Sequence, residues 1–434
     1  MPTASATSSS GDRGFVEFLR SLAPFLLVLA LGLVMHFIVK PMLSPFYAKV
    51  LIDIGINVVL AVSLTIVNGF TGQFSMGHAA FMLVGGYVAA TIVYYGSMMI
   101  WGDAMAYGGR VSGADEGLWF RPADVMFLGA ILAGGIVAAG CGYLVGLPSL
   151  RLRGDYLAIV TLGFGEIVRV LVQNLTTDVL YTTEEISATP IYKLPLMVGG
   201  SLGFSGLPFY NSMFWVAVAV GATMAVSYRL KQSSYGRAFL SIREDEIAAE
   251  AMGVDTTRYK VRAFVLAAFF AGIAGGLFAH TVGVTLNPAE LGFMKSFDII
   301  IMVVLGGMGS ISGAAIAATG LTILPELLRA PPHVWPAGLV VLVLAVVLSG
   351  GKRLKAAIWV VSITIALELI RYFALKKGIN LADYRMILYA LSLILIMILR
   401  PKGLLGVREV WDRQWWRSLV QAAHGRTRRR RSSS

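Results

Sequence analysis

Long apolar runs recur along this chain, and they constrain its fold more than any other feature. A membrane-spanning helix needs about 20 mostly apolar residues. Only 14% of the residues are charged, whereas soluble domains carry about 25%. The sequence therefore predicts an all-α polytopic integral membrane protein with about ten spans, and the membrane domain covers residues 22–407. The predicted spans are 22–39, 49–67, 78–95, 126–147, 156–175, 213–228, 263–282, 335–349, 356–374 and 386–399.

The apolar region 297–328 differs from these runs because glycines divide it. Its two apolar halves are separated by the sequence Gly-Gly-Met-Gly-Ser-Ile-Ser-Gly, which extends from Gly306 to Gly313. We expect this region to form a broken or re-entrant helix pair.

The distribution of positive charge indicates the orientation. With the N-terminus inside, 24 of the 36 Lys and Arg residues fall in inner segments and 10 in outer loops. Cytoplasmic loops carry such an excess, so both termini are expected to be cytoplasmic, with 1–21 disordered and 22–39 an uncleaved span. The net charge of +12 follows from this pattern, and we expect no nucleic-acid partner.

A polar segment, residues 229–262, interrupts the apolar runs. Ser241 and Glu244 have the spacing of a capping box, and Gly253 is placed to end a helix. Asp255 can then cap the next helix. We expect one short amphipathic helix, 241–252, held between two spans, with a solvated loop as the alternative. Its apolar stripe would be Ile247, Ala248, Ala251 and Met252.

Several motifs of this chain resemble those of the permeases for branched-chain amino acids in ATP-driven (ABC) importers, in particular the larger of the two permease subunits. Residues 246–253, Glu-Ile-Ala-Ala-Glu-Ala-Met-Gly, are similar to the cytoplasmic loop that docks on the ATPase in that family. The other similar stretches are Asn68–Phe81, Leu150–Leu157, Thr161–Arg169, Leu305–Gly309 and Arg400–Gly406.

The resemblance implies a bacterial inner-membrane location and several partners. These would be a second permease subunit, two ATP-binding subunits and an extracytoplasmic solute-binding protein. It also implies that the polar segment couples to the ATPase. The implied coupling residues are Glu244, Glu246, Ala248, Ala249, Glu250, Ala251 and Gly253.

The sequence itself carries no nucleotide-binding motif, which agrees with an ATPase on another chain. The nearest stretch, Gly350–Arg353, lacks the hydroxyl residue that binds magnesium. The five histidines are scattered, so we do not expect a membrane-embedded enzyme. We expect no catalytic residue, metal ligand or cofactor in this chain.

Two interrupted segments are candidates for the solute path. Irregular backbone at membrane depth is tolerated where it is buried or lines a cavity, and interrupted spans point to binding sites in transporters. The alternative is that the glycines only allow close helix packing. The candidate residues are Asn68, Gln73, Ser75 and His78 in the first break, and Gly306, Gly307 and Gly309 in the second.

One ion pair is expected inside a span. Glu166 and Arg169 are spaced i,i+3, so they can neutralise each other, and we interpret the pair as structural. A stand-alone secondary transporter, the alternative from another class, would be expected to place a chain of acidic residues along its path.

The chain departs from the family pattern in two places. Residues 180–187 replace a Gly-rich stretch of the family, which leaves urea, short amides or aromatic acids as alternative solutes. Residues 331–378 are interpreted as a two-span insertion. The tail 408–434 contains a tryptophan stripe and a run of arginines, which is typical of contact with lipid at the inner membrane surface.

Overall fold

The computed structural model describes residues 27–102, 122–149, 155–210, 212–281, 285–329, 390, 394 and 403–410. The chain divides into two compact units, Met1–Ile300 and Ile301–Ser434, and each is described by itself. The predicted N-terminal segment 1–21, the insertion 331–378 and the tail beyond 410 lie outside the described residues. So do the predicted spans 335–349 and 356–374, and all but two residues of 386–399.

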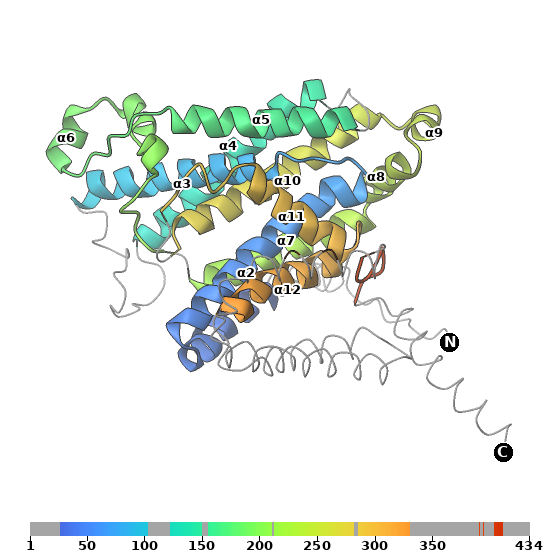
Figure 1. Cartoon of the computed structure of the whole chain (residues 1–434), viewed down its shortest axis with the longest axis horizontal. Helices are drawn as coiled ribbons and strands as arrows, with labels where there is room; N and C mark the ends of the chain where they lie inside the picture. The colour runs from blue at the N-terminus through green and yellow to red at the C-terminus, as the bar shows by residue number, and fades with distance from the viewer. Residues whose placement is uncertain are drawn as a thin grey trace, which may run out of the picture. The chain divides into compact units, whose positions relative to one another are not determined.

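The first unit confirms the predicted membrane architecture. The described residues include six helices that are long and apolar enough to cross a bilayer, and each overlaps a predicted span. A shorter apolar helix, Leu27–Met42, overlaps the first predicted span. The six helices, shown in Figure 1, are α2 (Pro45–Leu64), α3 (His78–Trp101), α4 (Pro122–Ser149), α5 (Asp155–Gln173), α7 (Met213–Gln232) and α10 (Thr256–Ala279).

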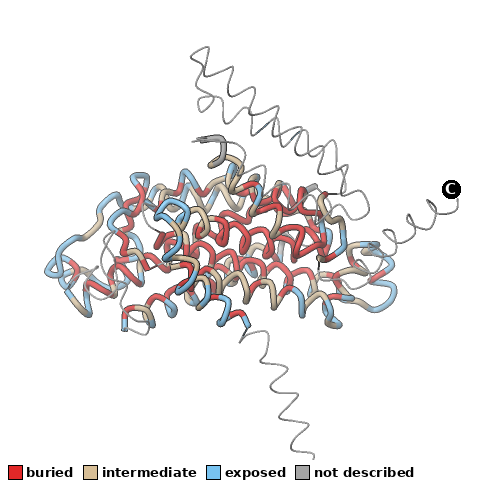
Figure 2. Tube along the Cα trace, turned by 90° about the horizontal axis from the view of Figure 1, so that it is seen from below, coloured by how far each residue is buried: buried red, intermediate tan, exposed pale blue. Residues whose placement is uncertain are grey.

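The helices α3, α4 and α10 pack on one another through glycines. A Cβ atom on Gly134 of α4 would lie 2.5 Å from the carbonyl oxygen of Gly85 on α3. A Cβ on Gly275 of α10 would lie 1.9 Å from the carbonyl oxygen of Met82. Small residues let membrane helices approach this closely. Figure 2 shows the result as long stretches of buried backbone, with exposed residues in the connections.

Tyrosines on α3 hold the connections at one end of this unit. The Tyr94 hydroxyl donates to the Leu180 carbonyl at 3.1 Å, and Tyr95 donates to the Met197 carbonyl. The Tyr87 hydroxyl donates to the carbonyl of Leu286, in the connection that follows α10, at 2.7 Å. The connection that follows α5 contains α6 (Thr183–Ala188) and two short 3₁₀ turns, η4 (Ile191–Leu196) and η5 (Gly200–Leu202).

The polar segment forms two helices between α7 and α10. These are α8 (Ser234–Glu244) and α9 (Glu246–Ala251). The prediction of a single helix over 241–252 is therefore wrong, because the chain breaks between Glu244 and Glu246.

The second unit contains the predicted broken pair. This unit begins at Ile301, within helix α11 (Phe293–Gly306), and α12 (Ile311–Arg329) follows a short break. Gly307 and Gly309 take positive φ angles of 108° and 100°, which side chains disfavour. Residues 403–410 lie along this break, and the Leu404 amide donates to the Leu305 carbonyl at 2.8 Å. The pair is thus present, and its insertion into the membrane stays a prediction.

Candidate translocation and coupling elements

The first predicted break lies between α2 and α3. Helix α2 continues as a wider π-helical turn, η3 (Thr65–Phe70), and α3 begins only at His78. The residues between them are not helical. Gly72 takes a φ of 70° there. π-helical turns are rare and often mark functional sites, so the interruption predicted from the sequence is a feature of the structure.

All four candidate side chains of this break are buried. Asn68, Gln73, Ser75 and His78 are between 1% and 8% exposed. The Asn68 Oδ1 atom accepts a hydrogen bond from the Ser75 amide at 3.2 Å, which brings these two residues together. His78 instead shares a hydrogen bond with Ser63 of α2, with 2.8 Å between Nε2 and Oγ. His78 therefore joins two helices, as the packing alternative expects.

Three polar atoms in this break have no hydrogen-bond partner within the part of the chain that the structure describes. They are Asn68 Nδ2, Gln73 Oε1 and Ser75 Oγ. An unsatisfied buried polar group costs about 1–3 kcal/mol, so each requires an explanation. An amide N–H, an amide oxygen and a hydroxyl can together donate to a carboxylate and accept from an ammonium group. This chemistry matches the polar part of an amino acid.

The second break offers less to a solute. A Cβ atom on Gly307 would lie 2.5 Å from the Gly406 carbonyl oxygen, so backbone fills the space beside it. The carboxylate of Glu409 occupies the start of α12, where it accepts from the amides of Ile311 and Ser312, both at 3.0 Å. The free helix-end donors that could have met a zwitterion are thus bonded to the chain's own carboxylate. A path-lining role for Gly306, Gly307 and Gly309 stays untested.

A polar cluster that the sequence analysis missed lies inside the first unit. The Lys295 ammonium donates to Asn57 Oδ1 at 3.0 Å, and Lys295 interacts electrostatically with Asp298 and Asp53. Asn57 stands midway along the apolar span Pro45–Phe70. The i,i+4 spacing of Asp53 and Asn57 within one apolar run was the available signal, because ionisable groups in spans need partners.

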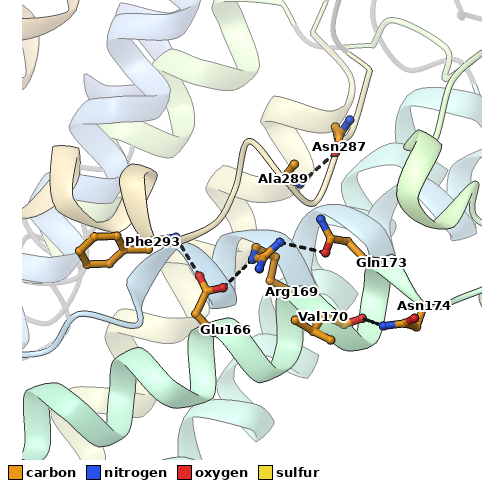
Figure 3. A network of polar contacts seen from close by, with 8 residues as sticks. All are labelled: Glu166, Arg169, Val170, Gln173, Asn174, Asn287, Ala289 and Phe293. Carbon is orange, nitrogen blue, oxygen red and sulfur yellow. Dashed lines mark hydrogen bonds and ion pairs between the residues drawn. The ribbon is translucent and has the colours of Figure 1, made fainter.

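Glu166 and Arg169 of α5 form the ion pair that their spacing predicted, with 2.7 Å between Arg169 Nε and Glu166 Oε2 (Figure 3). Glu166 also accepts from the Phe293 amide at 3.2 Å, and Arg169 donates to Gln173 at 2.9 Å. These contacts fix the approach to α11. Among the residues that the structure describes, no three His, Cys, Asp or Glu side chains are grouped so that they could hold a metal ion.

The start of the coupling helix differs from the prediction. Ser241 does not cap a helix: it lies inside α8, and its hydroxyl donates to the Ala238 carbonyl at 2.9 Å. Ser233 caps α8 by accepting from the Gly236 amide. The carboxylate of Asp245 accepts from the Ile247 and Ala248 amides at 2.9 and 3.0 Å and so starts α9. A helix is therefore capped by the Asp245 carboxylate and not by the predicted capping box of Ser241 and Glu244. As a result, α8 ends at Glu244.

The acidic residues of α9 hold it against α10. Glu246 forms an ion pair of 2.7 Å with Lys260, whose side chain is only 3% exposed. Glu250 accepts from the Thr256 hydroxyl at 2.6 Å. Ala249 is buried and packs inside this chain, so it does not belong to the exposed side of α9, and its role in coupling to the ATPase stays a prediction.

The opposite face of α9 is exposed and apolar. Ile247 is 66% exposed and Met252 is 84% exposed, and Ala248 and Ala251 are exposed with them. We call these four residues the α9 face. The sequence predicted this stripe correctly. Single exposed apolar residues are ordinary, whereas contiguous exposed apolar residues can mark an interaction surface.

The end of α9 agrees with the prediction. Gly253 has a φ of 84°, and the Val254 amide donates to the Ala249 carbonyl at 3.0 Å, as in a glycine-terminated helix. Asp255 then caps α10 by accepting from the Arg258 amide at 3.0 Å.

Comparison with known proteins adds the family. Residues 46–397 match the family described as the permease component of branched-chain amino acid transport systems. The high-affinity branched-chain amino acid permease protein LivM of Salmonella typhimurium is 36% identical over 290 residues, which cover 63% of this chain and 61% of LivM. The chain thus spans about three fifths of that relative's length. No solved structure matches the chain.

Two further relatives carry related names. LivH of Escherichia coli, a permease protein of the same kind of system, is 27% identical over 59% of this chain and 76% of its own. A probable LivM of Methanocaldococcus jannaschii is 25% identical over 65% of this chain and 81% of its own. With a family match over most of its length and a helical membrane fold, this chain belongs to the family of permease components of branched-chain amino acid transport systems.

Proposed function

We propose that this chain is the membrane-spanning permease subunit of an ATP-driven importer of branched-chain amino acids in a bacterial inner membrane. Its family and the names of its relatives support this solute over urea, short amides or aromatic acids. The complex would also contain a second permease subunit, two ATP-binding subunits and an extracytoplasmic binding protein. Both termini would be cytoplasmic.

The observation that carries this proposal is the α9 face. Its apolar side chains point away from the protein, while Glu246 and Glu250 fasten the other side of the helix to α10. A short helix that is rigidly attached and apolar on its free side can bind in the groove of a partner. We assign that groove to the ATP-binding subunit, since this chain has no nucleotide-binding motif of its own.

The solute would pass the first break. Asn68, Gln73 and Ser75 present donors and acceptors that have no partner among the residues the structure describes, beside the end of a π-helical turn. In this proposal a zwitterionic backbone bonds to these atoms during passage. The hydrophobic side chain of the solute makes the apolar contacts along the path.

The test replaces Ile247 by aspartate in the tagged chain, expressed with its partner subunits. We expect the ATP-binding subunits to be lost on purification and uptake of labelled leucine to fall by at least about tenfold, since a buried unpaired charge costs several kcal/mol. The matched control is Ile191→Asp, which also changes an exposed isoleucine (75% exposed) but in the connection after α5. The control should retain both the subunits and uptake.

Retention of the ATP-binding subunits by Ile247→Asp would contradict the docking role. Leucine uptake by the purified chain alone in liposomes, driven by an ion gradient, would instead favour a secondary transporter. A complex that transports urea or short amides but not leucine would contradict the proposed solute.

A further inference from the structure

Arg243 connects the polar segment to the first break. It lies in the last turn of α8, and its Nη1 atom donates to the backbone carbonyl of Gly69 at 2.9 Å. Gly69 belongs to the π-helical turn η3 and directly follows Asn68. The sequence separation of 174 residues explains why no local pattern revealed this contact.

The backbone of α8 also lies directly on the break. A Cβ atom on Gly72 would lie 3.0 Å from Arg243 Cγ and 3.3 Å from Arg243 Cα. Gly72 has a φ of 70°, so glycine is favoured there both by conformation and by space. Lys231, in the last turn of α7, places its ammonium 5.7 Å from the centre of the Phe70 ring. The polar segment therefore contacts η3 at more than one point.

The Arg243–Gly69 hydrogen bond lies between the exposed apolar α9 face and a group of buried polar atoms. Ile247 of the α9 face is four residues after Arg243. On the other side of the Arg243–Gly69 bond lie the three polar atoms of Asn68, Gln73 and Ser75 that have no partner among the described residues. Buried polar atoms without a hydrogen bond cost free energy, so a second conformation in which these atoms are hydrogen-bonded is favoured.

We propose that Arg243 is the positioning residue through which the α8–α9 segment moves the first break. This inference rests on the proposed docking of the α9 face on an ATP-binding subunit. When that subunit displaces α9, the Arg243 guanidinium displaces the Gly69 carbonyl, and η3 and residues 71–77 rearrange. The side chains of Asn68, Gln73 and Ser75 then leave their buried positions and contact the solute.

The chemistry of the side chain suits this role. A guanidinium is always charged and holds an acceptor through a rigid planar set of donors, whereas an amine is a single flexible point of charge. Its bond to a carbonyl at the end of a helix is charge-assisted. Lysine at this position would keep the charge but lose the fixed geometry.

The experiment uses the complete complex in liposomes with a reporter in the break. Cys141, the only native cysteine, is replaced by serine, and Ser75→Cys provides a nearly isosteric thiol. The rate at which a small methanethiosulfonate modifies that thiol is measured with and without ATP and vanadate. The variants compared are Arg243→Gln, Arg243→Lys and Arg237→Gln. Arg237 is the matched control, since it lies on the same helix but its guanidinium donates to Ser234.

We expect nucleotide to change the modification rate by about tenfold or more in the parent and in Arg237→Gln, as a shift of one order of magnitude in a two-state equilibrium would. In Arg243→Gln the nucleotide effect should be lost, while the ATP-binding subunits still co-purify and hydrolyse ATP. Leucine uptake, measured for Arg243→Gln in a chain that keeps Ser75, should be abolished. Arg243→Lys should restore the effect only in part.

A full nucleotide effect in Arg243→Gln would overturn the inference, as would its complete restoration in Arg243→Lys. The Ile247→Asp variant separates this failure from that of the proposed function. If Ile247→Asp retains the ATP-binding subunits, the docking proposal itself is wrong. If it loses them while Arg243→Gln behaves as the parent, only the role of Arg243 is wrong.

Discussion

Single glycines determine how closely the inner helices of the first unit approach. Gly134 and Gly140 both lie on α4, six residues apart, yet their surroundings differ. A Cβ on Gly134 would lie 2.5 Å from the carbonyl oxygen of Gly85, whereas a Cβ on Gly140 would meet nothing within 4 Å. Composition alone could not distinguish them, because the difference lies in the helix on the other side of the contact.

These two positions give a paired prediction. Gly134→Ala should lower the free energy of unfolding by about 1–3 kcal/mol, because an added methyl forces two backbones apart. Gly140→Ala should be neutral or slightly stabilising, since alanine is favoured over glycine in helices by about 1 kcal/mol. Thermal unfolding of the purified complex in detergent measures both. Equal melting temperatures for the two variants would contradict the close packing at Gly134.

The polar residues of the first break show what sequence can predict at this scale. The run of small polar residues between two apolar spans was enough to predict an interruption with buried polar side chains. It could not assign partners, because those depend on which helices are neighbours. His78, for example, bonds to Ser63 of the neighbouring helix α2, and its role in the solute path stays a prediction. The Lys295–Asn57 contact brings together residues 238 positions apart, so the spacing of Asp53 and Asn57 could indicate a polar site on α2 but not that Lys295 is its partner.

Helix ends explain where the prediction of elements failed. The sequence contains two possible starts in the polar segment, a Ser-x-x-Glu pattern at Ser241 and a carboxylate at Asp245. The carboxylate bonds two free amides, and its charge also favours the positive end of a helix, so the chain breaks there. The helix ends at Gly253 and Asp255 had no such competitor and were predicted correctly.

The start of α12 is bonded to the C-terminal segment 403–410, and this contact yields a prediction about that segment. Glu409 accepts from two α12 amides and from the Ser312 hydroxyl, the last at 2.6 Å. Ser312→Ala removes that hydroxyl, which also accepts from the Val410 amide. We expect Ser312→Ala to raise the rate of tryptic cleavage after Arg408 by at least about tenfold, as the loss of a charge-assisted bond of about 1.5–3 kcal/mol would.

Thr319→Ala is the control for this measurement. Within the described part of the chain, the Thr319 hydroxyl bonds to the Ala315 carbonyl of its own helix, so cleavage after Arg408 should stay at the parent rate. Glu409→Ala should exceed the effect of Ser312→Ala, since it removes every bond of the carboxylate. A parent-like rate in both Ser312→Ala and Glu409→Ala would show that residues 403–410 are held by other contacts.

At the scale of the whole molecule, the spans were the most predictable feature. A helix in lipid must satisfy its own backbone bonds, so apolar length alone decides where helices form, and six predicted spans have long helices. Their packing order was not predictable, because it depends on glycines that meet between helices far apart in sequence. Orientation depends on a third kind of evidence, the distribution of Lys and Arg.

That orientation gives a prediction for intact cells. In a Cys141→Ser background, a cysteine replaces either Arg237 on α8, expected inside, or Tyr192 after α5, expected outside. Both positions are exposed, Tyr192 by 74%, so accessibility within the protein does not separate them. A membrane-impermeant maleimide should label the Tyr192→Cys variant and leave Arg237→Cys unlabelled, and opening the cells should make both reactive. Labelling of Arg237→Cys in sealed cells would place the α9 face outside, where no ATP-binding subunit could reach it.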